Sequence, residues 1–405
     1  MDIENKKYRE NINKYKIEVI IDNFEGIISQ FPIERQNVIL RDPKFDYLKG
    51  LKLLQKFTVN KDYIYTTYNF SKDKTNHNFK SKGRLFSQNP SLQSLPREFR
   101  NTICDENIVD FDFENCHFVI LIQYCKTNNI YNENIQYYVD NRDKVMKNLI
   151  KTYENSSKLD RNDIKQGLLS ILNGGNASKL NDTFTNDLRN EIKAVHDFVK
   201  NAFSDDYYEA EKLVKKGKLY SASGSIINKI LCELERKALQ VNCEFIETKG
   251  FVSSVLMFDG VMAENLKNIN VDDTFLKECS DFVAEKTGIP LIVTSKPLNR
   301  LDLTNFKTKN EIKKEEKLIK DNDKADAKLL KNKIKVEALE EEKLDKQITK
   351  KETNKTLKQA KDNKELILLN AEIDKIKANY ELNKREKKQL KKWFCIILMK
   401  HLIIE

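Results

Sequence analysis

The chain has 405 residues, a formal net charge of +10 and a pI near 8.9. This length suffices for two or three domains, and the positive charge weakly indicates a polyanionic partner. The opening residues are too polar for a signal peptide and no apolar run is long enough to cross a bilayer, so we expect no membrane partner.

Cysteine and histidine usage bears on metals and on the cell compartment. The seven cysteines form no CxxC pair and there are only four histidines, so we expect no zinc site. Free thiols are typical of a reducing compartment, which predicts an intracellular protein.

The first expected region, residues 1–80, combines helical and strand segments. Within it, residues 61–70 (KDYIYTTYNF) alternate as a strand does. Residues 82–96 (KGRLFSQNPSLQSLP) are loop-like, because they contain a glycine and two prolines.

A mixed region of helices and strands, residues 81–300, follows. A strand over 107–113 leads into a helix over about 116–126. The pattern predicts helix over 137–153, 160–203 and 225–240, and an apolar strand over 251–257. Asp259 and Gly260 come next, and an Asp-Gly pair between apolar runs is typical of a tight hairpin.

The last region, residues 301–405, differs in composition. It has 28 Lys and Arg against 20 Asp and Glu, a net of +8, whereas residues 1–300 have 44 against 42, a net of +2. It contains neither glycine nor proline, which favours helix. We expect a long, solvated, Lys/Glu-rich helical extension or linker; a coiled coil with a specific partner is the alternative.

Two aspartates, Asp110 and Asp112, lie in a strand that is otherwise suited to burial. Buried carboxylates are costly unless they are paired or hold a metal. If the strands that end at Asp112 and Asp259 lie side by side, the two carboxylates need a cation between them. Mg²⁺ is such a cation, and a pair of ions supports phosphoryl transfer. The simpler interpretation, that Asp259 is only a turn residue, stays open.

A second pattern repeats every four residues at Arg161, Lys165, Leu169 and Asn173, which would lie along one face of a helix. Its cationic end suits a triphosphate, and its other end suits a base or a sugar. An ordinary amphipathic helix with a glycine cap is the alternative.

The order of these features resembles the polymerase core of family A DNA polymerases over roughly residues 80–300. The loop from Gly83 to Pro96 looks like the family's GRL…P-N-L-Q-N-I-P segment, and DFENCH, residues 112–117, falls on motif A. Arg161 and Lys165 fall on the first two landmarks of motif B, and FDG, residues 258–260, falls on motif C.

The resemblance is closer to a divergent branch, the polymerases of virophages and related transposons, which are often fused to a helicase. This branch shows similar arginines after the loop, here Arg97 and Arg100. It also shows a D-x-D-x-x-N-x-H motif A, here residues 110–117, and an N-G-G run, here residues 173–175. No helicase P-loop is present, so a helicase would lie outside this sequence or in a partner.

The resemblance implies an α+β fold: a right-hand polymerase with a palm of antiparallel strands, helical fingers and a reduced thumb, followed by the charged helical extension. Residues 1–80 would then be thumb-like. It also implies two Mg²⁺ ions, for which Mn²⁺ can substitute, a DNA primer–template and dNTPs.

The resemblance assigns roles to single residues. Asp112, Asp259 and the Phe113 carbonyl would hold the metal ions, Asp110 would support them from behind, and Lys165 would act with the two aspartates in catalysis. The nucleotide would be bound by Arg161, Lys165, Leu169, Asn173 and His117, and the DNA by Arg84, Gln93, Arg97 and Arg100.

The sequence departs from the family pattern at the positions that contact the sugar. His117 stands where motif A has a glutamate that helps exclude ribose, and Leu169 and Asn173 replace the aromatic pair of motif B. We therefore expect a template-directed DNA polymerase that replicates a viral or mobile-element genome, in the cytoplasm, the nucleus or a viral factory. The alternatives are an RNA-synthesising or primer-making relative, an inactive nucleic-acid-binding scaffold and an unrelated metal-dependent hydrolase.

Overall fold

The computed structural model describes residues 3–4, 6–41, 46–58, 61–70, 83–154, 159–358 and 363–401. The chain divides into two compact units, Met1–Thr308 and Lys309–Glu405. The expected boundary between 300 and 301 lies close to this division. Part of the expected first region, residues 71–80, lies outside the described residues.

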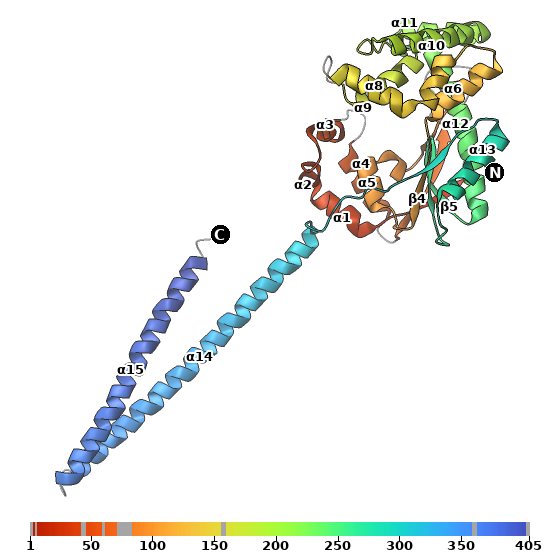
Figure 1. The fold of residues 1–405 in the computed structure, drawn as a ribbon. Coiled ribbons are helices and arrows are strands. Elements are labelled where there is room, and N and C mark those ends of the chain that lie inside the picture. The colour runs from red at the N-terminus through yellow and green to blue at the C-terminus, as the bar shows by residue number, and fades with distance from the viewer. Residues whose placement is uncertain are drawn as a thin grey trace. The chain divides into compact units, whose positions relative to one another are not determined.

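A four-stranded antiparallel sheet organises the first unit (Figure 1). Its spatial order is β5-β6-β4-β7. The strands are β4 (Ile108–Phe113), β5 (Val252–Met257), β6 (Gly260–Glu264) and β7 (Val293–Lys296). Side chains alternate between the two faces of a strand, so Val255 and Met262 enter one hydrophobic core while Leu256 and Val261 enter another. The sheet therefore has a core on each face.

A smaller antiparallel sheet of order β1-β2-β3 packs beside β5. Its strands are β1 (Lys7–Asn11), β2 (Tyr63–Phe70) and β3 (Leu85–Ser87). The buried Glu10 carboxylate accepts hydrogen bonds from the Tyr68 and Ser91 hydroxyls and from the Leu92 amide. This network ties β1 and β2 to the loop after β3. The expected strand over 61–70 is confirmed as β2.

Short helices fill the space next to the two sheets (Figure 1). They are α1 (Lys14–Asp22), α2 (Phe24–Ile28), α3 (Ile33–Arg41), α4 (Tyr47–Phe57), the single 3₁₀ turn η1 (Leu92–Ser94) and α5 (Arg97–Ile103). Together with β4 and β5 they form the second core.

A group of helices gathers at one end of the four-stranded sheet (Figure 1). These are α6 (Cys116–Thr127), α7 (Glu133–Asp140), α8 (Arg142–Glu154), α9 (Arg161–Leu172), α10 (Thr183–Ala202) and α11 (Ser204–Lys215). The prediction of helix over 160–203 is wrong for residues 173–182, because α9 ends before Asn173 and Gly174, and Gly174 has a φ of 73°.

Two further helices, α12 (Ala222–Lys249) and α13 (Asp273–Thr287), pack on the strands of the four-stranded sheet. α12 begins where the Ser221 hydroxyl accepts a hydrogen bond from the Gly224 amide, and it ends at Gly250, whose φ is 105°. The expected helix over 225–240 lies within α12, which is longer at both ends. α12 also packs on α6 and thus connects the helical group to the sheet.

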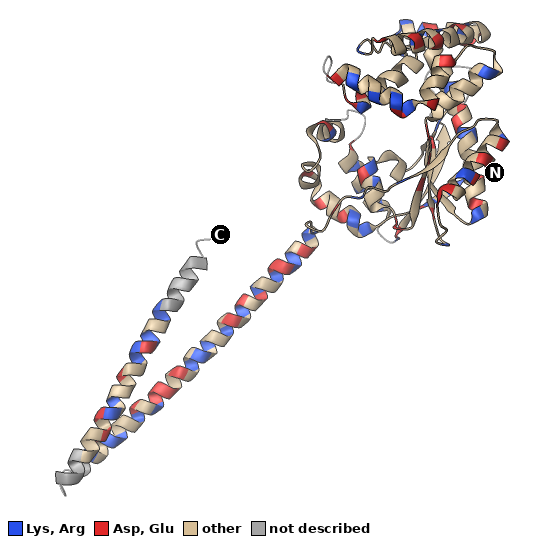
Figure 2. Cartoon of the chain, viewed as in Figure 1, with Lys and Arg blue, Asp and Glu red and all other residues tan. Residues whose placement is uncertain are grey.

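The second unit consists of α14 (Lys309–Lys358) and α15 (Asn363–His401). An ion pair joins Lys351 to Glu372 at 3.5 Å, and the Tyr380 hydroxyl donates to Asp345 at 3.4 Å, so residues later on α15 contact residues earlier on α14 and the two helices run antiparallel. Charged residues are spread along both helices (Figure 2), and the expected charged helical extension is present as a helical pair. None of the helices in the described part of the chain is long and apolar enough to span a membrane.

Candidate active site

A tight hairpin between β5 and β6 carries Asp259. The hairpin predicted from the sequence is confirmed, but its turn consists of Phe258 and Asp259 instead of Asp259 and Gly260, because Gly260 already begins β6. Phe258 has a φ of 44°, a left-handed conformation that bulky residues rarely adopt. The Phe86 ring lies 5.3 Å from the Phe258 ring, centroid to centroid, and the Arg84 guanidinium lies 4.8 Å from the same ring. These contacts hold the turn in its unusual conformation.

Gly260 allows the hairpin to approach β4 closely. It lies opposite Asp112 in the sheet, and the Phe113 amide donates a 3.0 Å hydrogen bond to the Asp259 carbonyl. A Cβ on Gly260 would lie only 2.4 Å from the Phe111 carbonyl oxygen and 3.0 Å from the Asp112 carboxylate. The close approach needs a residue without a side chain, and it places Asp259 beside the end of β4.

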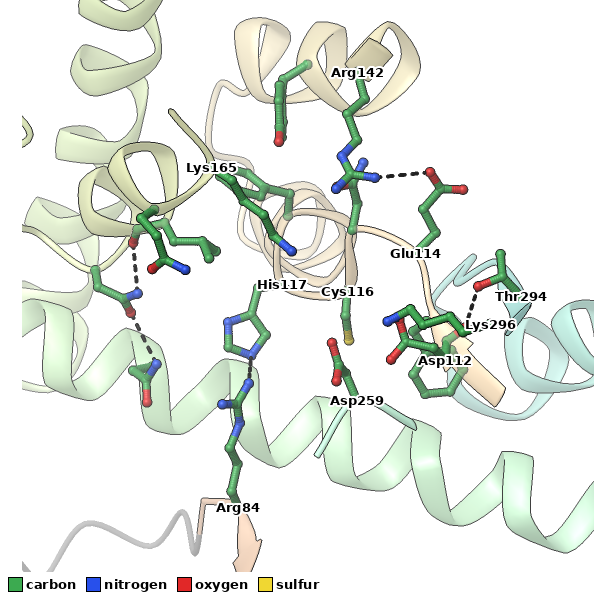
Figure 3. A pocket seen from close by; sticks show the side chains of 18 residues that line it. Arg84, Asp112, Glu114, Cys116, His117, Arg142, Lys165, Asp259, Thr294 and Lys296 are labelled. Atoms are coloured by element: carbon green, nitrogen blue, oxygen red, sulfur yellow. Dashed lines mark hydrogen bonds and ion pairs between the residues drawn. The ribbon is translucent and has the colours of Figure 1, made fainter. Parts of the chain in front are cut away.

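The carboxylates of Asp112 and Asp259 line one pocket (Figure 3). Burial, and then the negative charge of Asp259, raise the pKa of Asp112 to about 7. Burial and the negative charge of Glu235 raise the pKa of Asp259. Lys296, on the neighbouring strand β7, forms an ion pair with Asp112 and partly offsets these effects. Asp112 on β4 and Asp259 in the neighbouring turn thus place two carboxylates in one pocket, which favours binding of positive charge there.

The pocket has a volume of about 580 Å³. Besides the two aspartates, four cationic side chains line it: Arg84, Arg142, Lys165 and Lys296. The backbone or side chains of Phe113, Glu114, Asn115, Cys116, His117, Phe118, Tyr138, Gln166, Leu169, Asn173, Asn228 and Thr294 complete its wall. Carboxylates at one side and cations around them suit a ligand that carries phosphate groups and bound cations.

Three members of the four-residue pattern on α9 reach this pocket: Lys165, Leu169 and Asn173. Lys165 points into the pocket (Figure 3). The Asn173 side-chain amide donates to the Leu169 carbonyl at 2.9 Å and its oxygen accepts from Asn228 at 3.2 Å. These three residues therefore lie on one side of α9 and its C-terminal end, as the four-residue spacing predicts.

Arg161, the first member of the pattern, does not line the pocket. Its side chain is 53% exposed and pairs with Asp143 at 3.2 Å. Arg142, at the start of α8, instead reaches the wall of the pocket and pairs there with Glu114 at 3.3 Å (Figure 3). The structure thus places Arg142, rather than Arg161, at the wall of the pocket.

A buried ionic cluster forms the floor of the pocket on the side of α12. The Glu235 carboxylate accepts two hydrogen bonds from Arg84, at 2.9 and 3.0 Å, and lies 3.2 Å from His117 Nε2. Burial alone would raise the pKa of Glu235, but the hydrogen bond and charge of His117, followed by those of Arg84, hold that pKa below its usual value. Burial lowers the pKa of Arg84, and Glu235 more than reverses this effect. Glu235 is therefore ionised.

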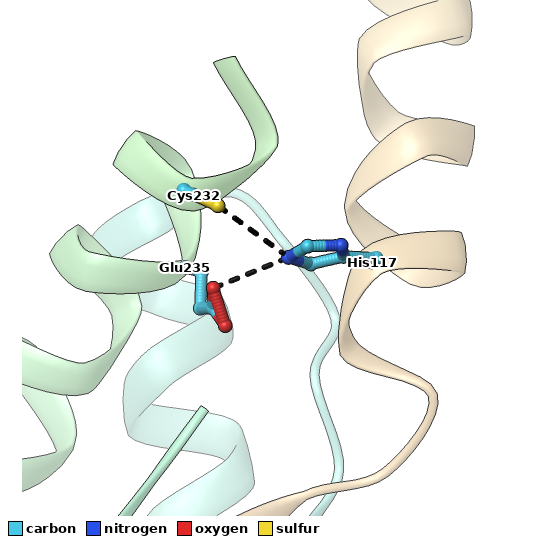
Figure 4. A group of neighbouring side chains, drawn as sticks. All are labelled: His117, Cys232 and Glu235. Carbon is cyan, nitrogen blue, oxygen red and sulfur yellow. Dashed lines mark hydrogen bonds and ion pairs between the residues drawn. The ribbon is translucent and has the colours of Figure 1, made fainter. Parts of the chain in front are cut away.

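Cys232 lies one helical turn before Glu235, and its sulfur is 4.0 Å from His117 Nε2 (Figure 4). By type and spacing, His117, Cys232 and Glu235 could hold a metal ion. Both Glu235 oxygens are already bound to the Arg84 guanidinium, which supplies the compensating positive charge. Among the described residues, this cluster is thus better suited to its own arginine than to zinc.

The loop before α5 contains residues expected to contact DNA. Arg84 faces the pocket, and Arg97 is exposed. The Gln93 side chain instead accepts from the Ser87 amide and donates to the carbonyls of Leu85 and Leu256, at 2.8 to 3.2 Å. These three bonds join β3 to β5, so the contacts of Gln93 are structural; its DNA contact stays a prediction.

Arg100 and Asp110 lie behind the pocket. Arg100 is only 8% exposed and its guanidinium donates to the Leu95 carbonyl at 3.4 Å. Burial raises the pKa of Asp110, and the positive charge of Arg100 opposes this. Asp110 lies two residues before Asp112 on β4 and opposite Lys296 on β7. Arg100 therefore acts on a carboxylate behind the pocket, and its contact with DNA stays a prediction.

The donor set of the pocket fits hard divalent cations. Asp112 and Asp259 are oxygen ligands, Phe113 also lines the pocket, and burial together with neighbouring carboxylates raises the pKa of both aspartates. Mg²⁺ and Mn²⁺ prefer carboxylate and carbonyl oxygens.

Several residues of the site escaped sequence reasoning: Glu235, Asn228, Arg142 and Lys296. Glu235 had a usable signal, because it continues the spacing of Ile227 and Leu231 and so puts a charge in line with an apolar stripe. Arg142 and Lys296 had no local signal, since only the packing of α8 and β7 brings them to the pocket.

Comparison with known proteins gives limited similarity. No family model matches the chain. Over 228 residues the chain is 26% identical to "Putative helicase V13" of the Sputnik virophage, and the match covers 53% of this chain. It covers 28% of that relative, so the chain spans just over a quarter of the relative's length.

Among solved structures, the chain is similar to the POL domain of Pol1 from M. smegmatis in complex with DNA primer–template and dNTP. The TM-score is 0.46 and the identity 13%, over 71% of this chain and 66% of that one.

Proposed function

We propose that the chain is a template-directed DNA polymerase of the family A type, which joins nucleotides to a primer 3′-hydroxyl by two-metal-ion phosphoryl transfer. The observation that carries this proposal is that Asp112, on β4, and Asp259, in the β5–β6 turn beside it, line one pocket together with four cationic side chains. The four-stranded antiparallel sheet would be the palm, the helical group with α9 the fingers, and residues 1–80 a reduced thumb.

Asp112 and Asp259, with the Phe113 carbonyl, would hold two Mg²⁺ ions, and Mn²⁺ can substitute. When bound, such ions favour loss of the proton from the primer 3′-hydroxyl and stabilise negative charge on the departing pyrophosphate. Asp110 supports Asp112 from two positions back on β4. Lys296 compensates the charge of Asp112 in the metal-free protein.

The phosphates of the incoming dNTP would be bound by cations on the opposite wall. Lys165 and Arg142 both reach this wall, and Lys165 would give a proton to the pyrophosphate as the bond to the α-phosphorus breaks. Arg161 would join them only after its side chain leaves Asp143. Leu169, Asn173 and His117 would surround the base and sugar.

The primer–template would lie against Arg84 and the exposed Arg97, while Gln93 and Arg100 would support the same region from behind. The 26% identity to a virophage protein supports a place in the virophage and transposon branch, and with it replication of a viral or mobile-element genome in the cell. The name of that relative favours a helicase that is fused to this chain or acts in trans.

Synthesis of RNA is the second candidate activity. The observation in its favour is His117, which lines the pocket at the position where family A polymerases have a ribose-excluding glutamate. A scaffold without activity is less favoured, because the two aspartates and four cationic side chains line the same pocket.

Primer extension with the full chain tests the proposal. A labelled primer–template is incubated with Mg²⁺ and either dNTPs or rNTPs, and the control is the double variant Asp112→Asn, Asp259→Asn. An exposed aspartate on α10, Asp187, supplies the matched variant Asp187→Asn. We expect extension with dNTPs that only the double variant loses. Extension mainly with rNTPs would favour the second candidate, and extension that survives in the double variant would contradict the metal site.

A further inference from the structure

Glu235 connects two sides of the proposed site. Its side chain is 1% exposed, and one of its oxygens contacts both Arg84 and His117. Arg84 in turn lies against the ring of Phe258, the residue before Asp259. The buried Glu235 carboxylate therefore contacts both His117, which lines the pocket, and Arg84, which supports the hairpin that carries Asp259.

The contact with Glu235 also decides the state of the His117 ring. A carboxylate only accepts hydrogen bonds, and its oxygen is 3.2 Å from His117 Nε2, closer than the Arg84 nitrogen at 3.4 Å. Nε2 therefore carries a proton. Nδ1 is then a hydrogen-bond acceptor when the ring is neutral and a donor when the ring is charged. An acceptor in the pocket wall can receive a hydrogen bond from a sugar hydroxyl. A ring without this restraint could present either nitrogen.

We propose that Glu235 is a positioning residue that fixes the orientation and tautomer of His117 and thereby sets how the pocket distinguishes ribonucleotides from deoxyribonucleotides. This inference rests on the proposed nucleotide site. The rest of α12 supports the same arrangement, because Cys232 contacts the His117 ring one turn away and Asn228 reaches the pocket two turns away.

The test compares binding of dATP and ATP to the full chain with a primer–template whose primer ends in a dideoxynucleotide. Binding is then measured without chemistry, by titrating each labelled nucleotide in Mg²⁺. The variants are Glu235→Gln, which keeps the shape but removes the charge, His117→Ala, and the two combined. Glu233→Gln is the matched control, since Glu233 lies on the same helix and pairs with Lys237.

We expect Glu235→Gln to change the ratio of the two dissociation constants by about tenfold, because it weakens a charge-assisted hydrogen bond. In the His117→Ala background the same substitution should add no further change to the ratio, since Glu235 acts through the imidazole. Glu233→Gln should leave the ratio unchanged.

An unchanged ratio in Glu235→Gln, or an effect that adds fully to that of His117→Ala, would overturn the proposal. If Glu235→Gln fails to fold, the variant His117→Gln replaces it in the test, since it leaves the Glu235–Arg84 pair intact. We expect His117→Gln to change the ratio of the two dissociation constants as well, and an unchanged ratio would overturn the proposal. If the wild type does not extend a primer, but Glu235→Gln still alters the ratio of the dATP and ATP dissociation constants, the polymerase activity is rejected and this inference stands.

Discussion

Replacing Asp112 by asparagine should stabilise the metal-free protein at high pH. The folded state raises the pKa of Asp112 to about 7 from the usual 3.8, through burial and the charge of Asp259. Between these two pH values the folded chain holds a proton that the unfolded chain has lost, so the free energy of unfolding falls as pH rises through this window. Asparagine resembles the protonated acid and removes this decline.

The size of the effect follows from the same two values. The difference of 7 − 3.8, about 3, corresponds to ~4 kcal/mol at 1.36 kcal/mol for each pH unit. The Asp112 side chain is 13% exposed, and Asp259 and Lys296 share in its titration. We therefore expect about half of this amount, ~2 kcal/mol, as the gain of Asp112→Asn at pH 8, and little gain near pH 4.

Urea unfolding followed by the near-UV circular dichroism of tyrosine measures this gain. All tyrosines except Tyr380 lie in residues 1–308, so the signal reports on the unit that holds the site. Mg²⁺ at about a hundred times its dissociation constant should stabilise the wild type by ~2.7 kcal/mol and should not stabilise Asp112→Asn. The matched control is Asp187→Asn. The electrostatic reasoning would be refuted if Asp112→Asn were no more stable than the wild type at pH 8, or if Mg²⁺ still stabilised it.

Three further outcomes are expected. Burial raises the pKa of Glu10 to about 7 from 4.5, so the free energy of unfolding should fall by ~3 kcal/mol as pH rises through this range. Glu10→Gln should abolish this decrease in urea titrations from pH 4 to 8. A decrease that persists in the variant would mean that another group causes it. Gly260→Ala should destabilise the protein by about 1–3 kcal/mol and weaken Mg²⁺ binding in a titration, because its Cβ would collide with β4; Gly26→Ala, with an ordinary 3.5 Å contact, is the control. Arg142→Ala should raise the KM for dNTP in primer extension by about tenfold, which is more than Arg161→Ala should raise it. A larger increase in KM for Arg161→Ala would indicate that Arg161, and not Arg142, contacts the phosphates.

The hairpin shows how far local pattern could go. An Asp-Gly pair between two apolar runs predicts a tight turn, and the turn is present at Phe258 and Asp259. The pattern did not show that the left-handed residue is Phe258, because that conformation depends on contacts with Phe86 and Arg84, which come from another sheet and a distant loop.

The helix α9 shows the same limit for the site. Four-residue spacing is enough to place Lys165, Leu169 and Asn173 on one face, since helical geometry repeats every 3.6 residues. It cannot say which members of the face reach a pocket. Arg161 is at the start of the helix, where Asp143 on α8 binds its guanidinium outside the pocket.

The sequence by itself determined several helices and strands between residues 61 and 264, the charged helical extension and the aspartates at or next to strand ends, because periodicity, turn residues and charge act over a few neighbouring positions. Only the tertiary structure decided which strands are adjacent, and hence that Asp112 faces Gly260 and Lys296 pairs with Asp112. It also decided that Glu235, more than a hundred residues from His117 in the sequence, contacts that ring. Such contacts depend on how whole elements pack, and no local pattern encodes them.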